Sequence, residues 1–112
     1  MKATSLNEFP ERPNPHGVSA RTIYDTQYAQ CLHIVLKPGE ALKKHITPVD
    51  VFFYILEGSG QVEIGNEVRE VQQDMVVESP ARVPHRLMNP KGEDFRFLVI
   101  KVPKPQEATK VL

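Results

Sequence analysis

The feature that most constrains this fold is a series of short apolar or alternating runs, each followed by turn residues. The runs cover 21–24, 30–36, 41–45, 51–56, 61–64, 68–71, 75–78, 85–88 and 95–102. Proline cannot donate to an interior β-ladder, and the ten prolines cluster where these runs begin or end. No segment shows a helical period with caps. The spacing predicts an all-β sandwich or barrel.

Length and proline distribution predict the domain organisation. The 112 residues are enough for one domain that buries its own core. A proline-rich stretch, 9–15, indicates an extended N-terminal arm, and a similar tail follows residue 102. We therefore expect a single domain over 1–112, with a barrel core at about 20–102.

Composition narrows the classes of function and location. Fourteen basic and fourteen acidic side chains give no net charge, which argues against general binding to nucleic acid or anionic membranes. Cys31 is the only cysteine, so no internal disulfide can form and a reducing compartment is expected. The longest apolar runs are too short to span a bilayer, and the first residues lack a secretory pattern. We expect a cytoplasmic protein.

Two histidines lie forty residues apart in similar β-rich surroundings. The first stretch has Gly39, five residues, His45-Ile46-Thr47, three residues, Val51, six residues and Gly58. This resembles the first motif of the cupin family, which is Gly, five residues, His-x-His, three or four residues, Glu, six residues and Gly. The resemblance implies a double-stranded β-helix, or jelly-roll barrel.

The second stretch resembles the second cupin motif, which is Gly, five residues, Pro-x-Gly, two residues, His, three residues and Asn. Here the chain reads Asp74, five residues, Pro80-Ala81-Arg82, two residues, His85, three residues and Asn89. The paired spacing covers roughly residues 30–102. It predicts that His45 and His85 meet inside the barrel.

The departures from these motifs concern the metal ligands. Cupins that bind metal usually use both histidines and the glutamate of the first motif, together with the histidine of the second. Here Thr47 and Val51 stand at two of those positions, which leaves His45 and His85. Catalytic metal sites usually keep three protein ligands and an open position.

A third ligand has two candidates. Asp50 would give a two-histidine, one-carboxylate set suited to iron(II) if a β-bulge turned it inward. The alternative is an exposed carboxylate at a strand start, since Asp50 and Val51 should point to opposite faces. His33 would give a three-histidine set if the face carrying Cys31, His33 and Val35 lined the barrel. The alternative is a histidine hydrogen-bonded to backbone beside the core.

Two further side chains are candidates for contact with a bound molecule. The Thr47 hydroxyl could orient a water or a small ligand. Arg86 could capture a carboxylate at the pocket mouth, although a solvated arginine is the alternative. His16, in the arm, is expected to be exposed.

Two functions stay open. One is a divalent metal centre, with Fe, Mn, Ni, Cu or Zn, that acts on or binds a small organic molecule. The other is a metal-free binding or sensor protein with His45, Thr47 and His85 as polar contacts in an apolar cavity. Enzymatic activity is left undecided. Exposed strand edges and the terminal arms favour a homodimer with either function.

Overall fold

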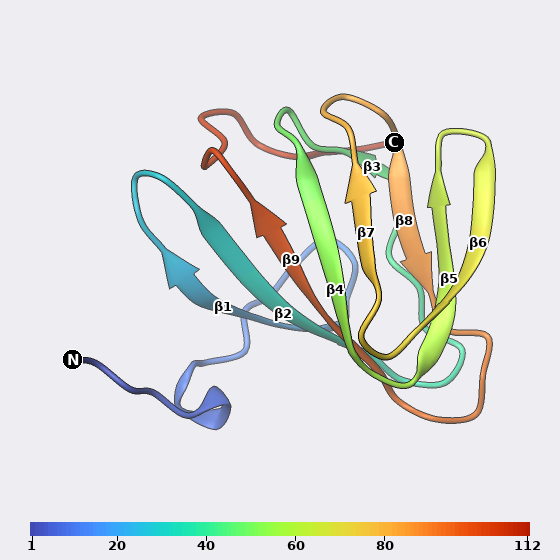
Figure 1. The fold of residues 1–112 in the computed structure, drawn as a ribbon, viewed down its shortest axis with the longest axis horizontal. Helices are drawn as coiled ribbons and strands as arrows, with labels where there is room; N and C mark the ends of the chain where they lie inside the picture. The colour runs from blue at the N-terminus through green and yellow to red at the C-terminus, as the bar shows by residue number, and fades with distance from the viewer.

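Ten β-strands make up nearly all the regular structure in the computed structural model, which describes residues 1–112 (Figure 1). They are β1 (Ser19–Asp25), β2 (Gln30–Leu36), β3 (His45–Ile46), β4 (Val51–Glu57), β5 (Ser59–Ile64), β6 (Glu67–Gln72), β7 (Val76–Ser79), β8 (His85–Met88), β9 (Phe95–Lys101) and β10 (Lys110–Val111). The one helical element is a 3-10 turn, η1 (Leu6–Glu8). The predicted all-β class is confirmed, and no helix has the length and apolarity needed to cross a bilayer.

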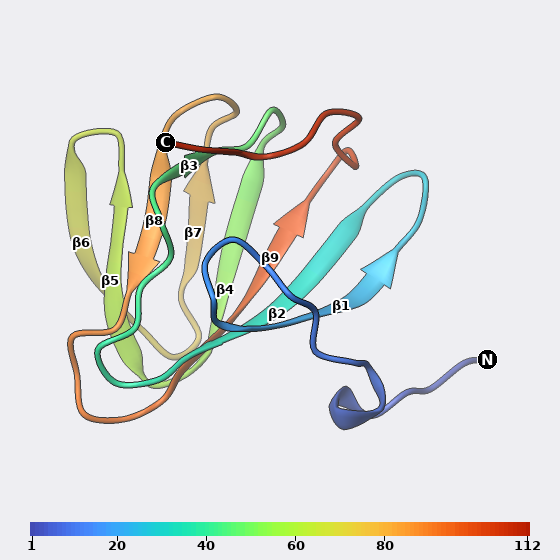
Figure 2. The ribbon, with the colours of Figure 1, turned by 180° about the vertical axis from the view of Figure 1, so that it is seen from behind.

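The strands form two antiparallel sheets that curl around a shared interior (Figures 1 and 2). The first sheet has the order β1-β2-β9-β4-β7, and the second has the order β10-β3-β8-β5-β6. Segments distant in sequence therefore lie side by side: β9 pairs with both β2 and β4, and β3 pairs with β8. This is the jelly-roll arrangement that the sequence predicted.

The predicted and observed strand boundaries agree best where typical turn residues flank the strand. β2 and β8 have the predicted bounds, and the Gly65-Asn66 turn joins β5 to β6 with Gly65 at a φ of +58°. The strand predicted over 41–45 is shorter, because only His45–Ile46 is assigned and Ala41 contributes an isolated bridge to Met88. The strand β10 was not predicted.

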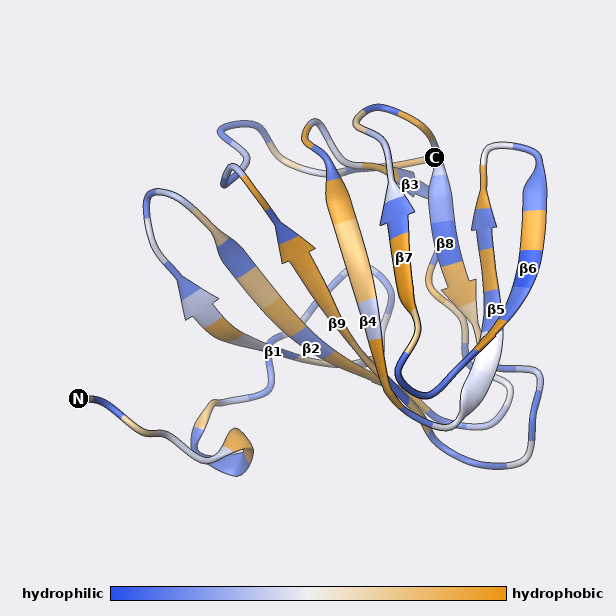
Figure 3. Ribbon diagram, viewed as in Figure 1, coloured by the Kyte–Doolittle hydropathy of each residue, from blue (hydrophilic) through white to orange (hydrophobic).

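The core fills the space between the sheets. Strand alternation turns every second residue inward, and the largest fully buried apolar side chains come from both sheets. They are Leu36, Phe53, Ile55, Leu87, Phe95 and Phe97. The apolar bands of β2, β9 and β4 are visible in Figure 3. Phe53 and Phe97 meet edge to face with ring centroids 6.3 Å apart.

The strand β4 corrects one expectation. From the sequence we expect the nearly continuous apolar run over 51–56 to be buried on both faces, but only alternate residues are buried. Phe53 is 1% exposed, whereas its neighbour Phe52 is 37% exposed. The second face of this sheet has no further layer over it, so the outward residues of β4 remain accessible.

Both terminal segments fold back onto the barrel. In the arm, the Arg12 amide donates to the Ala20 carbonyl (2.8 Å), and Glu11 forms a bridge with Arg21 on β1. In the tail, β10 adds to the edge of β3, with Val111 opposite His45. The two segments lie on the same side of the molecule in Figure 2. They therefore become part of the wall around the pocket described next.

Candidate functional site

A cavity of about 190 Å³ lies between the sheets at the end of the barrel covered by the two terminal segments. Its walls are mostly apolar, and its polar groups are few. The lining residues discussed below are His16, Ile34, His45, Thr47, Phe53 and Lys101. The tail contributes Thr109 and Val111, so the cavity depends on parts of the chain that lie outside the predicted barrel core.

The fold brings His45 and His85 together. They are direct partners in the β3–β8 ladder, and their ring centroids are 4.5 Å apart in an edge-to-face arrangement. His45 is 8% exposed and His85 is 2% exposed. Thr47 lies beside them and is also buried. Three of the residues singled out from the sequence therefore form one cluster.

His85 has hydrogen-bonding partners on both ring nitrogens. Its Nδ1 lies 2.6 Å from Ser79 Oγ, and its Nε2 lies 3.3 Å from Thr47 Oγ1. Phe53 also packs edge to face on the ring at a centroid distance of 5.3 Å. His85 does not line the cavity, so its contacts fix it as a buried structural group behind His45.

His45 and His16 are fixed in opposite neutral tautomers by one residue, Lys43. The Lys43 carbonyl can only accept, so His45 Nδ1, at 2.7 Å, carries the proton and its Nε2 keeps a lone pair. The Lys43 amide donates to His16 Nδ1 at 2.8 Å, so in the neutral His16 ring the proton lies on Nε2. The two rings are 5.0 Å apart and both line the cavity.

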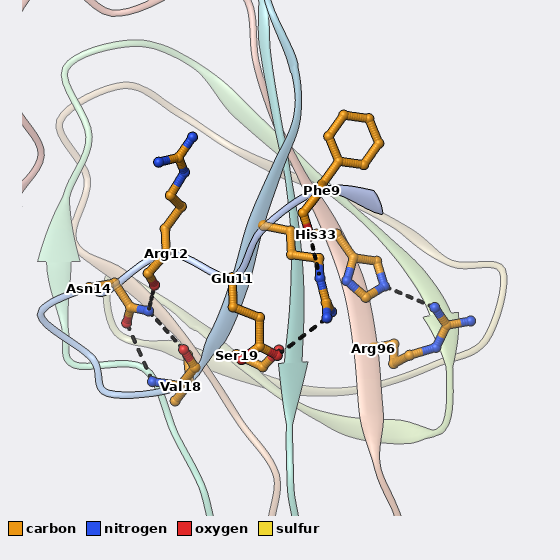
Figure 4. A network of polar contacts seen from close by, with 9 residues as sticks. Phe9, Glu11, Arg12, Asn14, Val18, Ser19, His33 and Arg96 are labelled. Atoms are coloured by element: carbon orange, nitrogen blue, oxygen red, sulfur yellow. Dashed lines mark hydrogen bonds and ion pairs between the residues drawn. The ribbon is translucent and has the colours of Figure 1, made fainter. Parts of the chain in front are cut away.

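A turn in the arm holds His16 in place. Asn14 donates through Nδ2 to the carbonyls of Arg12 (3.0 Å) and Val18 (2.7 Å), and its Oδ1 accepts from the Val18 amide (Figure 4). The same Oδ1 accepts from the His16 amide at 3.1 Å. Gly17 adopts a φ of +68°, which closes the loop. The loop that carries His16 is therefore ordered by its own side chain.

Burial keeps these imidazoles neutral. It lowers the pKa of His16 to about 4, and the nearby His45 and Lys43 add to the effect. It also lowers the pKa of His85 to about 3, with smaller effects from His45 and Lys101. For His45, burial lowers the pKa more than the hydrogen bond to Lys43 raises it. At neutral pH all three rings are uncharged.

Lys101 is the only charged side chain in the wall of the cavity. It is the last residue of β9, where alternation turns it inward after Phe97 and Val99. Burial lowers the pKa of its ammonium group. No carboxylate lines the cavity to neutralise this cation.

Asp50 and Arg86 lie away from the cavity. Asp50 is exposed, and its Oδ1 accepts from the Ala81 amide at 2.8 Å, so it holds the loop before β8. Arg86 points to the outer face of β8 and binds Glu63 at 2.6 Å. This contact is the main reason that the pKa of Glu63 is lowered. The structure therefore does not place Asp50 or Arg86 beside His45.

His33 lies on the opposite face of β2 from the cavity. Leu32, Ile34 and Leu36 form the more apolar face and turn inward, which sends His33 outward. It is nevertheless 2% exposed, beneath the contacts between the arm and β1 shown in Figure 4. Arg96 Nη1 donates to its Nε2 at 2.8 Å, and its Nδ1 has no partner. His33 is not near enough to His45 to complete a metal site.

The donor set does not fit a metal centre of the expected kind. No group of three or more His, Cys, Asp or Glu side chains is arranged to hold an ion. His85 has both ring nitrogens occupied by hydroxyl groups, which leaves His45 Nε2 as the one unengaged nitrogen of the central pair. The lost ligand positions hold Thr47 and Val51, and neither Asp50 nor His33 replaces them.

Comparison with known proteins assigns the family. The family model for the cupin domain matches residues 32–101. The chain is a cupin. The crystal structure of TT1209 from Thermus thermophilus is 27% identical, with a TM-score of 0.79 over 94% of this cupin and all of that chain. The uncharacterized protein MJ0764 of Methanocaldococcus jannaschii is 27% identical over 86 residues, covering 76% of this cupin and 74% of MJ0764.

A more distant structure shows the fold alone. The polyketide cyclase RemF from Streptomyces resistomycificus superposes with a TM-score of 0.85 at 17% identity, covering all of this cupin and 85% of RemF.

The backbone also explains the unusual motif residues of this cupin. Asp74 and Arg82, which replace the glycines of the second motif, have φ values of 68° and 65°. The left-handed turns of the motif are kept without glycine.

Sequence reasoning missed three groups of the site. His16 was expected to be exposed, because a loop flanked by proline and glycine gives no sign of where it folds. Lys101 was not considered, although counting alternate residues from Phe95 would have turned it inward. Ser79 lies just after the run predicted over 75–78 and was not considered; the pairing of β7 with β4 and the loop to β8 bring it to His85.

Proposed function

We propose that this cupin binds a small organic carboxylate in the cavity beside His45, without a metal ion. The observation that carries the proposal is the charge of the wall: Lys101 is its one charged side chain and no acidic residue balances it. Lys101 is partly buried, and an ammonium group withdrawn from water without a partner is destabilising, so an anion beside it offsets that cost. The three neutral histidines leave this single positive charge to select the ligand.

The size of the cavity limits the ligand. A cavity of roughly 150 Å³ accommodates benzene in an engineered protein. The 190 Å³ cavity of this cupin therefore suits one six-membered ring or a short branched chain with a carboxylate. Ile34, Phe53 and Val99 offer an apolar surface for that body. His45 Nε2 and His16 Nε2–H add one acceptor and one donor for further polar groups of the ligand.

The metal-dependent function predicted from the sequence has less support. It would need a third ligand beside His45 and His85, and Asp50 and His33 lie elsewhere. The binding experiment therefore includes metal as a separate arm. An affinity that appears only after reconstitution with Fe, Mn, Ni, Cu or Zn would favour the metal centre over the present proposal.

The proposal is tested with two probes, cyclohexanecarboxylate and benzoate, added to chelator-treated protein. A ligand at about one hundred times its Kd stabilises the folded state by about 2.7 kcal/mol, which raises the Tm of a chain this size by about 10 °C. We expect such a rise for at least one probe. The uncharged amide of the same acid should give a much smaller rise, since it cannot pair with Lys101.

A matched pair of variants tests whether Lys101 is the cation that pairs with the ligand. Lys101→Gln should abolish the rise in Tm, because it removes the cation in the wall. Lys104→Gln removes a nearby cation that pairs with Asp25 at 2.7 Å and does not line the cavity, so it should leave the rise intact. Equal behaviour of the two variants, or no rise with either probe, would contradict the proposal.

The homodimer predicted from the sequence stays a prediction, and the outer face of the first sheet is the surface on which we propose it. Phe52 and Val76 are exposed there, at 37% and 57%. Tyr54 and Ile100 are their ladder neighbours on the same face. Light scattering of the wild type and of Phe52→Lys tests this surface: a dimer that persists in the variant would remove it.

A further inference from the structure

The cavity contains one imidazole that can act as a base, His45, and one that can donate a hydrogen bond, His16. His45 presents a lone pair on Nε2, and His16 presents an N–H on Nε2, because Lys43 engages Nδ1 of each ring in opposite senses. The ring centroids are 5.0 Å apart, so one small molecule can meet both groups. A purely structural role would not require either Nε2 to remain free of a protein partner.

The residue whose backbone sets these tautomers, Lys43, is itself held on both sides. The Leu42 amide donates to the Leu87 carbonyl at 2.9 Å, and the Leu112 amide donates to the Lys44 carbonyl at 2.9 Å. Lys43 therefore lies between two fixed hydrogen bonds, one to β8 and one to the tail. The opposite tautomers of His16 and His45 are a consequence of backbone geometry, and solvent does not choose them.

We propose that His45 and His16 act as a proton-transfer pair on small carboxylates that carry a carbonyl group, with 2-oxo acids as the substrate class. This inference rests on the proposed binding of a carboxylate at Lys101. Lys101 holds the carboxylate, His16 Nε2–H donates to the carbonyl oxygen, and His45 Nε2 removes a proton from the carbon beyond the carbonyl. The reaction is reversible enolisation, which exchanges or relocates that hydrogen.

The step balances without an added reagent. The C–H bond breaks, its proton forms an N–H bond on His45 Nε2, and its electron pair becomes the carbon–carbon double bond of the enolate. The carbonyl π electrons move to the oxygen, where the His16 N–H stabilises the new charge. Return of the proton from the His45 imidazolium to carbon restores neutral imidazole. No oxidant, reductant or metal ion takes part.

The electrostatics of the cavity suit this exchange. Before binding, burial keeps His45 neutral and therefore able to accept a proton. A bound anion favours the imidazolium form, which raises the basicity of His45 only when substrate is present. The enolate and the imidazolium then neutralise each other, while Lys101 balances the substrate carboxylate in a wall that has no acidic side chain.

The test follows hydrogen exchange at C3 of 2-oxobutanoate and 4-methyl-2-oxopentanoate in D2O by proton NMR, with chelator-treated protein. Wild type should exchange C3 hydrogens well above the rate in buffer with an equal concentration of free imidazole. Asparagine places its amide where Nδ1 lies, so His45→Asn can keep the bond to Lys43 while losing the base. A positioned general base contributes roughly 10²–10⁴-fold, and the variant should lose at least about 100-fold.

His16 is tested by two amide variants of different length, one that reaches the Nδ1 position and one that reaches the Nε2 position. His16→Asn can still accept from the Lys43 amide but has no donor at the Nε2 position, so it should exchange more slowly. His16→Gln keeps an amide donor near that position and should recover part of the rate. Equal rates for these two variants would overturn the role of His16, since a loss of packing would affect both.

Binding of the same two acids, measured by the rise in Tm, separates this inference from the proposed function. Binding with no exchange above the imidazole control would overturn the proton-transfer pair and leave the binding function standing. Absence of both would overturn both. Borohydride treatment distinguishes a further route: a covalent adduct on Lys101 would show that its amine forms an imine with the substrate, and would overturn the assignment of Lys101 to the carboxylate and of His16 to the carbonyl oxygen.

Discussion

The two ends of the barrel interior are built on the same strands but differ in chemistry. At the packed end, Leu36 lies opposite Phe95 and Ile55 lies opposite Phe97, and all four side chains are fully buried. At the pocket end, the same strand β9 finishes in Lys101 and meets the imidazoles from β3 and the arm. One period-two pattern therefore supplies both a dense core and a polar cavity, and the residue types along β9 decide where one gives way to the other.

The largest expected effect is a loss of stability caused by a substitution at the packed end. Phe97→Ala removes a ring that touches Phe53 and Phe95, with centroids 6.3 and 5.2 Å away. Truncation of a buried phenylalanine costs about 3–5 kcal/mol of unfolding free energy through lost burial and the remaining cavity. Urea unfolding measures this loss. His45→Asn, at the pocket end, should lower the unfolding free energy far less. A comparable loss in both variants would contradict the distinction between a dense core at one end and a polar cavity at the other.

A smaller effect appears on acidification and originates at the pocket end. The folded-state pKa of His85 is about 3, while an unfolded histidine has a pKa of about 6.5. Between these values the unfolded chain binds a proton that the folded chain excludes, so stability falls as the pH drops from about 6.5 toward 3. One such group gives a slope of up to about 1.4 kcal/mol per pH unit. Unfolding measured from pH 7 to pH 4 checks it.

The control for the pH series is His85→Gln. This variant should be less stable at pH 7, because the contacts with Ser79 and Thr47 change. It should nevertheless lose less stability than wild type on acidification, since the excluded proton is gone. An unchanged slope would show that other groups carry the acid sensitivity.

The smallest expected effect concerns the tail. Removal of residues 109–112 deletes β10 and two lining side chains, but it leaves the core cluster complete. We expect an unfolding free energy within about 1–2 kcal/mol of wild type, since only a few backbone hydrogen bonds are lost, together with weaker binding of cyclohexanecarboxylate. Unchanged affinity in the truncated protein would show that the tail does not shape the cavity.

Sequence reasoning predicted the fold well because its signals are local. The bounds of β2 and β8 follow from composition and turn residues, and the motif spacing correctly implied that His45 and His85 approach each other. It was harder to predict which side chains of a strand point into the barrel and which point outward. His33 and Asp50 were considered as ligands on an assumed inward orientation, but the apolar face of β2 and the loop contact of Asp50 direct them elsewhere.

The rest of the site depends on contacts that sequence does not encode locally. His16 reaches the cavity because the Asn14 turn and the Lys43 amide hold it there. The residues of β10 form a strand only because the edge of β3 is available to them. Such placements result from tertiary packing, so the composition of the arm and tail gave no indication that they line a pocket.

The most direct test of this account reads the protonation of the two cavity imidazoles. Long-range proton–nitrogen correlation NMR of the chelator-treated protein at pH 7 distinguishes the two tautomers and the charged form. The account predicts a proton on Nδ1 of His45 and a bare Nε2, with the reverse for His16. A proton on Nε2 of His45, or a charged ring at either position, would contradict it.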